Sequence, residues 1–177
     1  MLAVGIGCKR DTSRELIEDA VKLAFADYKI SEKDIVSIAT SETKASEIGL
    51  LQFCSDRSLP LILFPSDILA TVSVPNPSSI VNEKVKTASV AEAAALLALT
   101  RVISNAGAKD SLSLQWNQDN NIYKPNSYLY KVNKHFIDST KTKLLTCRLL
   151  IPKQIYQNTV TIAAASIYAP EEYNLSY

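Results

Sequence analysis

The sequence has few cysteines, a single histidine and almost no excess charge, and each shortage removes a class of protein. The three cysteines, Cys8, Cys54 and Cys147, are odd in number and far apart, which excludes a disulfide framework and a zinc ribbon. The one histidine, His135, has no second His, Cys or acidic residue at metal-ligand spacing, so we expect no metal and no cofactor. The formal net charge of +1 argues against a dedicated nucleic-acid surface.

Long hydrophobic runs are also missing. No apolar stretch is long enough to cross a bilayer, so no membrane partner is expected. The first apolar run, Leu2–Ile6, is too short for a secretory signal and is followed at once by Lys9 and Arg10. Unpaired cysteines suit a reducing cytosol, and the sequence therefore predicts a cytoplasmic protein.

Short apolar runs alternate with helical patterns along the chain. The strand-like runs are Leu2–Ile6, Ile35–Thr40, Leu61–Phe64, Leu144–Ile151 and Thr159–Ile167, and the helix-like ones are Leu16–Phe25, Ala45–Arg57, Ile68–Val72, Ile80–Lys86 and Ala93–Leu99. Such alternation predicts an α/β fold whose sheet is mixed but mostly parallel, with helices on both faces. We expect the last two strands to be antiparallel, joined by a turn that begins at Pro152-Lys153-Gln154.

A polar segment interrupts this pattern. From Ser104 to Lys143 the composition changes to Asn, Gln, Ser, Lys and Tyr, over a length too great for an ordinary connection. It is expected to be either disordered or an insertion with its own hairpin, built from Ser111–Trp116 and Tyr128–Val132. The chain of 177 residues is predicted to form one domain, residues 1–177, with a polar insertion at about 104–143.

The first strand leads into a bend that has the features of an anion site. Gly5 and Gly7 allow a ligand to approach the main chain, and Asp11–Ser13 supplies N-cap residues for the next helix. A helix N-terminus that follows a glycine turn favours anions, and Lys9 and Arg10 add positive charge there. The third glycine of a dinucleotide-binding fingerprint is absent, so an ordinary tight strand–helix turn is the alternative.

Several side chains near this bend are candidates for chemistry. Cys8 lies beside two cations and a helix start, which lower a thiol pKa, but no histidine outside the insertion offers a base. Glu42 and Glu47 lie near Lys44, either as an acid–base pair or as the solvated start of a helix. The catalytic residues are unknown from the sequence, and the candidates are Glu42, Lys44 and Cys8.

Two residues outside the bend also have alternative interpretations. Ser89 and Glu92 have the spacing of a capping box, which makes Glu92 a capping partner rather than a catalyst. Lys153 is either a surface lysine or a residue that reaches the carboxyl edge of the sheet, where ligands of α/β proteins bind.

Five stretches along the chain form a recognisable set. They are Gly5–Arg10, Ala39–Ala45 with Glu47, Gly49 and Leu50, Val74–Ser78, Ser89–Leu96, and Lys153 followed by Thr159–Ala163. Together, in this order, they resemble the family formed by CobE and the C-terminal domain of CbiG, proteins of cobalamin biosynthesis. The segment Ser104–Lys143 departs from that family, which passes there with a short connection.

The resemblance implies three α/β/α layers and the binding of a precorrin or corrinoid intermediate, whose acetate and propionate carboxylates suit backbone N–H groups and cationic side chains. The implied ligand contacts are Gly5, Gly7, Cys8, Lys9, Arg10, Thr12, Thr40, Glu42, Lys44, Asn76, Ser78, Ser89, Glu92 and Lys153. CbiG-type proteins open the δ-lactone of cobalt-precorrin-5A and release acetaldehyde, so assistance in that hydrolysis is a second hypothesis. A third is a non-catalytic interaction module for another corrin-pathway enzyme, with the insertion as its docking surface.

Overall fold

The centre of the molecule is a parallel three-stranded unit. In the computed structural model, which describes residues 1–76, 89–105, 114–117, 122–125 and 146–168, β1 (Leu2–Cys8), β2 (Ile35–Ser41) and β3 (Leu61–Phe64) pair in parallel. All three strands were predicted, and the bounds of β3 agree with the predicted ones. The carboxyl ends of these strands therefore meet at one edge of the sheet, which we call the carboxyl edge.

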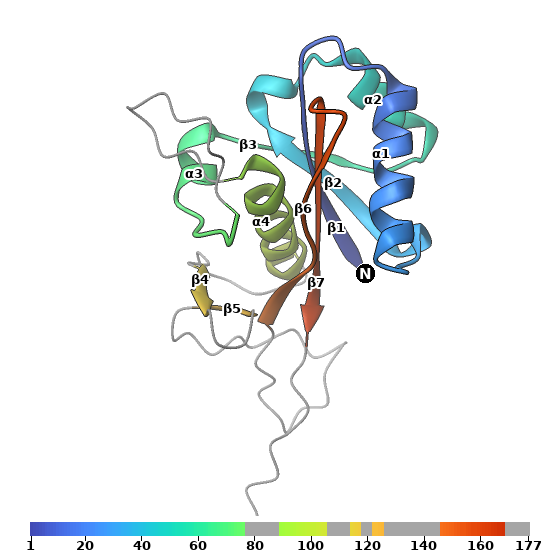
Figure 1. Ribbon diagram of the computed structural model, residues 1–177. Helices are drawn as coiled ribbons and strands as arrows, with labels where there is room; N and C mark the ends of the chain where they lie inside the picture. The colour runs from blue at the N-terminus through green and yellow to red at the C-terminus, as the bar shows by residue number, and fades with distance from the viewer. Residues whose placement is uncertain (77–88, 106–113, 118–121, 126–145, 169–177) are drawn as a thin grey trace, which may run out of the picture.

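Four antiparallel strands complete the sheet. They are β7 (Val160–Tyr168), β6 (Thr146–Tyr156), β5 (Ile122–Pro125) and β4 (Leu114–Asn117), and the full order is β3-β2-β1-β7-β6-β5-β4 (Figure 1). The sheet is mixed, as predicted, but antiparallel pairs outnumber parallel ones, so the expectation of a mostly parallel sheet was wrong. The reason is that the described strands after the last long helix pair as antiparallel hairpins and form no further βαβ unit.

Helices cover both faces of the sheet, which gives the predicted α/β/α layers (Figure 1). On one face lie α1 (Arg14–Asp27) and α2 (Ile48–Asp56), and on the other lie α3 (Ser66–Ala70) and α4 (Val90–Asn105). Alternation along β1 explains the division, because Leu2, Val4 and Ile6 join the core beneath α1 and α2 while Ala3 joins the core beneath α4.

Small residues let α4 lie close to the sheet. A Cβ added at Gly5 would lie 1.8 Å from the carbonyl oxygen of Ala91, and Ala91, Ala94 and Ala95 are fully buried. The main chain of α4 thus occupies the space that a side chain at Gly5 would need. The close approach for which Gly5 was expected is made by this helix and not by a ligand.

The strand β6 departs from a regular ladder where a turn was predicted. Pro152 and Lys153 lie inside the strand, between the pairs Ile151↔Ala164 and Gln154↔Ile162. In that interval β6 advances three residues and β7 two, so β6 carries a bulge. Proline is tolerated at a bulge because its missing N–H is not needed by the ladder. The turn itself lies at 157–158, where both residues have positive φ (47° and 50°).

The predicted insertion contains a hairpin, although its second arm differs from the expected one. The pairing of β4 with β5 joins Trp116 to Tyr123 and Leu114 to Pro125. The expected second arm, Tyr128–Val132, lies outside the described residues, as does the short helix predicted at Ile80–Lys86.

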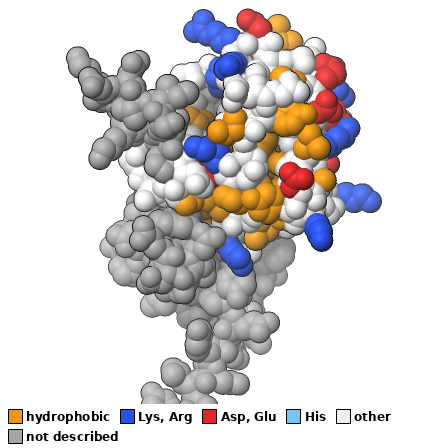
Figure 2. All heavy atoms as spheres, in the orientation of Figure 1, with side chains coloured by type: hydrophobic (Ala, Val, Ile, Leu, Met, Phe, Trp, Pro, Cys, Tyr) orange, Lys and Arg blue, Asp and Glu red, His pale blue; other side chains and the backbone are white. Residues whose placement is uncertain are grey.

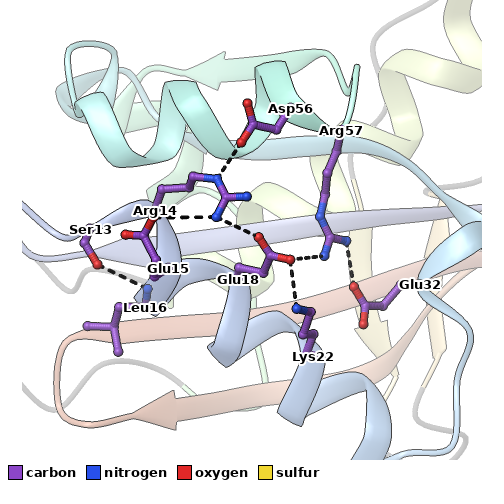
Figure 3. A network of polar contacts seen from close by, with 9 residues as sticks. All are labelled: Ser13, Arg14, Glu15, Leu16, Glu18, Lys22, Glu32, Asp56 and Arg57. Atoms are coloured by element: carbon purple, nitrogen blue, oxygen red, sulfur yellow. Dashed lines mark hydrogen bonds and ion pairs between the residues drawn. The ribbon is translucent and has the colours of Figure 1, made fainter.

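An ion-pair network ties α1, α2 and the short helix η1 (Glu32–Asp34) together (Figure 3). Arg14 bonds Asp56 on α2 and Glu18 on its own helix, while Arg57 bridges Glu18 to Glu32. Ser13 caps α1 by accepting a hydrogen bond from the Leu16 amide at 3.2 Å. In this network the charged side chains pair with one another, and the pairs connect α1 to α2 and to η1 on the same face of the sheet.

The visible surface carries charges of both signs. Figure 2 shows basic and acidic side chains interspersed with apolar ones, with no broad area of one sign. This agrees with the small net charge. Among the described residues, no helix has both the length and the apolar character needed to span a membrane.

Candidate functional site

The structure brings the predicted bend and the second predicted motif together at the carboxyl edge. Glu47 precedes α2, and its Oε2 accepts a hydrogen bond from the Asp11 amide at 3.0 Å, 36 residues away in sequence. Its Oε1 accepts one from Lys44 Nζ at 3.1 Å. Gly49 allows the two segments to meet, because a Cβ there would lie 2.2 Å from the carbonyl oxygen of Thr12.

Internal hydrogen bonds already use much of the bend. The Lys9 amide donates to the carbonyl of Thr159 at 3.0 Å, and the buried Thr12 donates its hydroxyl proton to the Lys9 carbonyl at 2.8 Å. The Asp11 amide binds the carboxylate of Glu47. One amide of the bend therefore binds a carboxylate, but this carboxylate is one of the protein's own.

The contact of Glu47 with the bend is what sequence reasoning missed. Glu47 was expected near Lys44, either in an acid–base pair with Glu42 or at the solvated start of a helix. Donation from Lys44 lowers the pKa of its carboxyl most strongly. Burial opposes this as the second-largest effect, and the Asp11 amide and the charges of Lys44 and Arg10 lower the pKa further. Its fixed distance from Asp11 is a tertiary contact, and no local pattern in the sequence indicates it.

Two cations at the bend remain exposed. The side chains of Lys9 and Arg10 are open to solvent, and within the described residues neither forms a salt bridge. Arg10 is near enough to Glu47 to affect the pKa of its carboxyl. These two residues can still bind an incoming anion with their side chains.

The environment of Cys8 differs from the expected one. Burial raises the pKa of the Cys8 thiol; Lys44 lowers it and Glu47 raises it, both by weaker effects. The prediction of a lowered pKa was wrong because Cys8 packs against the core beneath α1 and α2, where desolvation outweighs the nearby positive charge. The thiol is the favoured form at neutral pH.

The strand β2 and the short helix after it contribute two predicted residues with opposite environments. Thr40 is fully buried, and its hydroxyl has no hydrogen-bond partner among the described residues. It is therefore closed to solvent. Glu42 begins the short helix η2 (Glu42–Lys44) and is exposed, so it is accessible to a ligand.

A second group of predicted residues meets at the N-terminus of α4. Glu92 is fully buried, and its Oε1 accepts hydrogen bonds from Asn76 Nδ2 and from the Lys153 amide, both at 2.9 Å. Its Oε2 accepts one from the Asn76 amide at 3.2 Å. Lys153 Nζ in turn donates to the Asn76 carbonyl at 2.9 Å. Ser89 is buried, and its Oγ accepts a hydrogen bond from the Glu92 amide at 3.4 Å, which is one half of the predicted capping box. The Glu92 carboxylate, which the other half would direct to the Ser89 amide, bonds Asn76 and Lys153.

The predicted site residues thus form two groups, one on each side of β1. Lys9, Arg10 and Lys44 lie with the loops that lead into α1 and α2, whereas Asn76 and Lys153 lie beside α4. Gly7 lies between them, where an added Cβ would meet the Thr161 hydroxyl at 2.4 Å. Ser78 lies outside the described residues.

Comparison with known families decides where the chain belongs. Residues 2–115 match the family described as Cobalamin synthesis G C-terminus. The chain belongs to this family. The match covers more than half of the chain, and it includes the bend, the Glu47 segment and the start of α4.

Individual relatives agree with membership of the cobalamin synthesis G C-terminus family. The chain is 32% identical over 97 residues to a protein from Priestia megaterium named cobalt-precorrin-5A hydrolase, and this covers 55% of the chain but only 26% of that relative. The chain therefore spans about a quarter of the length of the curated relative it matches.

Two solved structures share the fold. CobE, from the cobalamin biosynthetic pathway, superposes with a TM-score of 0.65 at 20% identity, covering 97% of this chain and 93% of its own. The cobalamin biosynthesis protein chiG from Agrobacterium tumefaciens gives 0.52 at 23% identity, covering 93% of this chain and 97% of its own. The α/β architecture and the cobalamin biosynthesis family are thus established.

Proposed function

We propose that this protein binds a precorrin or corrinoid intermediate of cobalamin biosynthesis at the carboxyl edge of the sheet. The observation that carries the proposal is the pair of exposed cations, Lys9 and Arg10, on the bend of a chain that belongs to the cobalamin synthesis G C-terminus family. Such ligands carry many carboxylates, and charge-assisted hydrogen bonds from Lys or Arg are among the strongest that proteins form.

Glu47 supports the carboxylate preference of this edge. One carboxylate already binds the Asp11 amide and Lys44 together. A ligand carboxylate has the same chemistry as Glu47, so it either binds beside it at Lys9 and Arg10 or takes its place. The exposed apolar side chains of Ile48 and Leu51, on the first turns of α2 directly after Glu47, offer a surface for part of the macrocycle.

The test is a titration with dicyanocobyrinic acid, a corrinoid whose side-chain carboxylates are free, followed by its visible spectrum. Arg10→Ala is expected to weaken binding about tenfold, because a lost charge-assisted hydrogen bond is worth roughly 1.5–3 kcal/mol. Lys33→Ala is the matched control, because it removes the same charge from an exposed residue that precedes β2 and so lies at the opposite edge of the sheet. Unchanged affinity in Arg10→Ala, or no binding by the wild type, would contradict the proposal.

A second candidate function is assistance in opening the δ-lactone, which the name of the Priestia megaterium relative favours. The candidates for such chemistry remain Glu42, Lys44 and Cys8, of which Glu42 is exposed and Cys8 is held as a thiol. A single-turnover assay for acetaldehyde distinguishes the two functions, because a protein that only binds releases none. The third hypothesis, docking of a pathway enzyme on residues 104–143, is tested by deleting that segment and measuring corrinoid affinity and partner binding separately.

A further inference from the structure

Glu92 combines complete burial with contacts to exposed parts of the site. It lies in the first turn of α4 and has no exposed surface, so it cannot touch a ligand. Its carboxylate accepts three hydrogen bonds from described residues, donated by Asn76 Nδ2, the Asn76 amide and the Lys153 amide. An ionised carboxylate satisfies that arrangement, because it only accepts.

The bulge in β6 explains why the Lys153 amide is available. In a regular antiparallel ladder this amide would lie in the plane of the sheet and point to β7 or to the opposite side of β6. The extra residue between Ile151 and Gln154 interrupts the ladder, and the Lys153 amide donates to Glu92 instead. The bulge therefore directs one residue of the strand towards the N-terminus of the helix.

The amide, the carbonyl and the side-chain Nδ2 of Asn76 all form hydrogen bonds. Glu92 accepts from its amide and its Nδ2, and Lys153 Nζ donates to its carbonyl. Asn76 itself is exposed and Lys153 is partly exposed, so both can be reached from solvent. One buried carboxylate thus fixes two accessible polar residues that come from segments 77 residues apart.

We propose that Glu92 is a positioning residue, which sets Asn76 and Lys153 for contact with the carboxylates of the ligand without touching it. This rests on the proposed function, because Asn76 and Lys153 are implied as ligand contacts only by the family resemblance. It also corrects the expectation that Glu92 itself binds the ligand. The arrangement assigns Asn76 and Lys153 to a second carboxylate subsite, on the α4 side of β1, beside the one at Lys9 and Arg10.

The test is a double-mutant cycle in the full chain with dicyanocobyrinic acid as the probe. Glu92→Gln keeps the shape of the side chain but turns one acceptor into a donor that faces another N–H, so Asn76 and Lys153 lose their fixed positions. We expect it to weaken binding about tenfold. Asn76→Ala should weaken binding to a similar extent alone, but add nothing in the Glu92→Gln background, since coupled residues are not additive.

A control separates positioning from general stability. Leu99→Ala removes a fully buried side chain from the far half of α4 and should lower stability while leaving affinity unchanged. If Leu99→Ala weakens binding as much as Glu92→Gln does, or if the losses from Glu92→Gln and Asn76→Ala simply add, the positioning role is overturned.

A second measurement distinguishes failure of this inference from failure of the proposed function. In NMR spectra of the ligand-free protein, Glu92→Gln should shift the Asn76 side-chain amide and the Lys153 backbone amide, and Glu92→Asp should shift them less. If these resonances do not move, Glu92 does not position the two residues. If they move as expected but the wild type binds no corrinoid, the proposed ligand is wrong and Glu92 fixes the two residues for another purpose.

Discussion

Glu47 and Glu92 perform the same local task in two different settings. Each accepts a hydrogen bond from a loop amide at the carboxyl edge, Glu47 from Asp11 and Glu92 from Asn76, and each belongs to a group that includes a lysine. Glu92 is fully buried, whereas 11% of the Glu47 side chain is exposed. The lysine also differs in its role, because Lys44 bonds the carboxylate of Glu47, while the ammonium of Lys153 bonds the Asn76 carbonyl.

Burial decides whether water or a ligand can take the place of each carboxylate at its hydrogen-bond donors. If Glu92 were lost, water would have little access to the donors that it satisfies, and buried N–H groups without partners are costly. If Glu47 were lost, water or a ligand carboxylate could reach the Asp11 amide and Lys44, because the bend is exposed. The α4 side of β1 is thus closed to water at Glu92. The other side, with Glu47, is open to water and carries the exposed cations.

The largest effect on stability is expected from a substitution that pushes α4 away from β1. Gly5→Ala places a Cβ against the main chain of α4 at Ala91, and a helix backbone cannot move aside as a side chain can. We expect the free energy of unfolding to fall by about 3 kcal/mol, at the upper end for overpacking. Gly7→Ala is the matched comparison, because its Cβ would meet only the Thr161 hydroxyl, and its cost should be about 1 kcal/mol. Equal losses in urea denaturation would show that α4 does not limit this position.

A difference of similar size should separate the two carboxylates directly. Glu92→Ala leaves the Asn76 and Lys153 amides without their acceptor in a closed environment, and we expect a loss of about 3 kcal/mol. Glu47→Ala leaves groups that water can reach, and we expect about 1 kcal/mol. The two variants are compared by urea denaturation at neutral pH. A cost for Glu47→Ala equal to that for Glu92→Ala would mean that the bend is as closed as the α4 side.

The sequence could predict what depends on local pattern. The run Leu61–Phe64 between two prolines identified β3, and the Ser89 spacing identified the start of α4. It could not predict the contact of Glu47 with Asp11, which depends on how two loops meet. Pro152 suggested a turn because proline usually interrupts strands, but the neighbouring strand β7 continues the ladder on both sides of the bulge.

The same limit explains the error at two site residues. Glycine at Gly5 is consistent with close approach of any main chain, and only the fold shows that the approaching chain is α4. The charges around Cys8 were readable from the sequence, but its burial against the core was not, and burial has the larger effect on its pKa.

The pH dependence of stability should distinguish Glu47 further. Its folded-state pKa is depressed, so its contribution is fully present above the ordinary pKa of a glutamate, about 4.3, and is lost as the pH falls through the lower folded value. The stability difference between the wild type and Glu47→Gln should therefore be constant near neutral pH and shrink below about pH 4. Urea denaturation at a series of pH values measures it. A difference that persists unchanged in acid would show that the charge of Glu47 is not what matters.

The smallest expected effect is a shift in the pH dependence of Cys8 alkylation, which reports on the side of β1 that carries the exposed cations. The raised pKa of Cys8 predicts alkylation by iodoacetamide with a midpoint above that of a free cysteine, about 8.5, when the rate is followed by mass spectrometry of the Cys8 peptide. Cys54 and Cys147 are internal controls, because burial raises their pKa values to about 11 and about 12. Glu47→Gln should lower the Cys8 midpoint and Lys44→Ala should raise it, since their charges act in those directions. A Cys8 midpoint below that of free cysteine would instead identify a reactive thiolate and restore Cys8 as a nucleophile for the lactone chemistry.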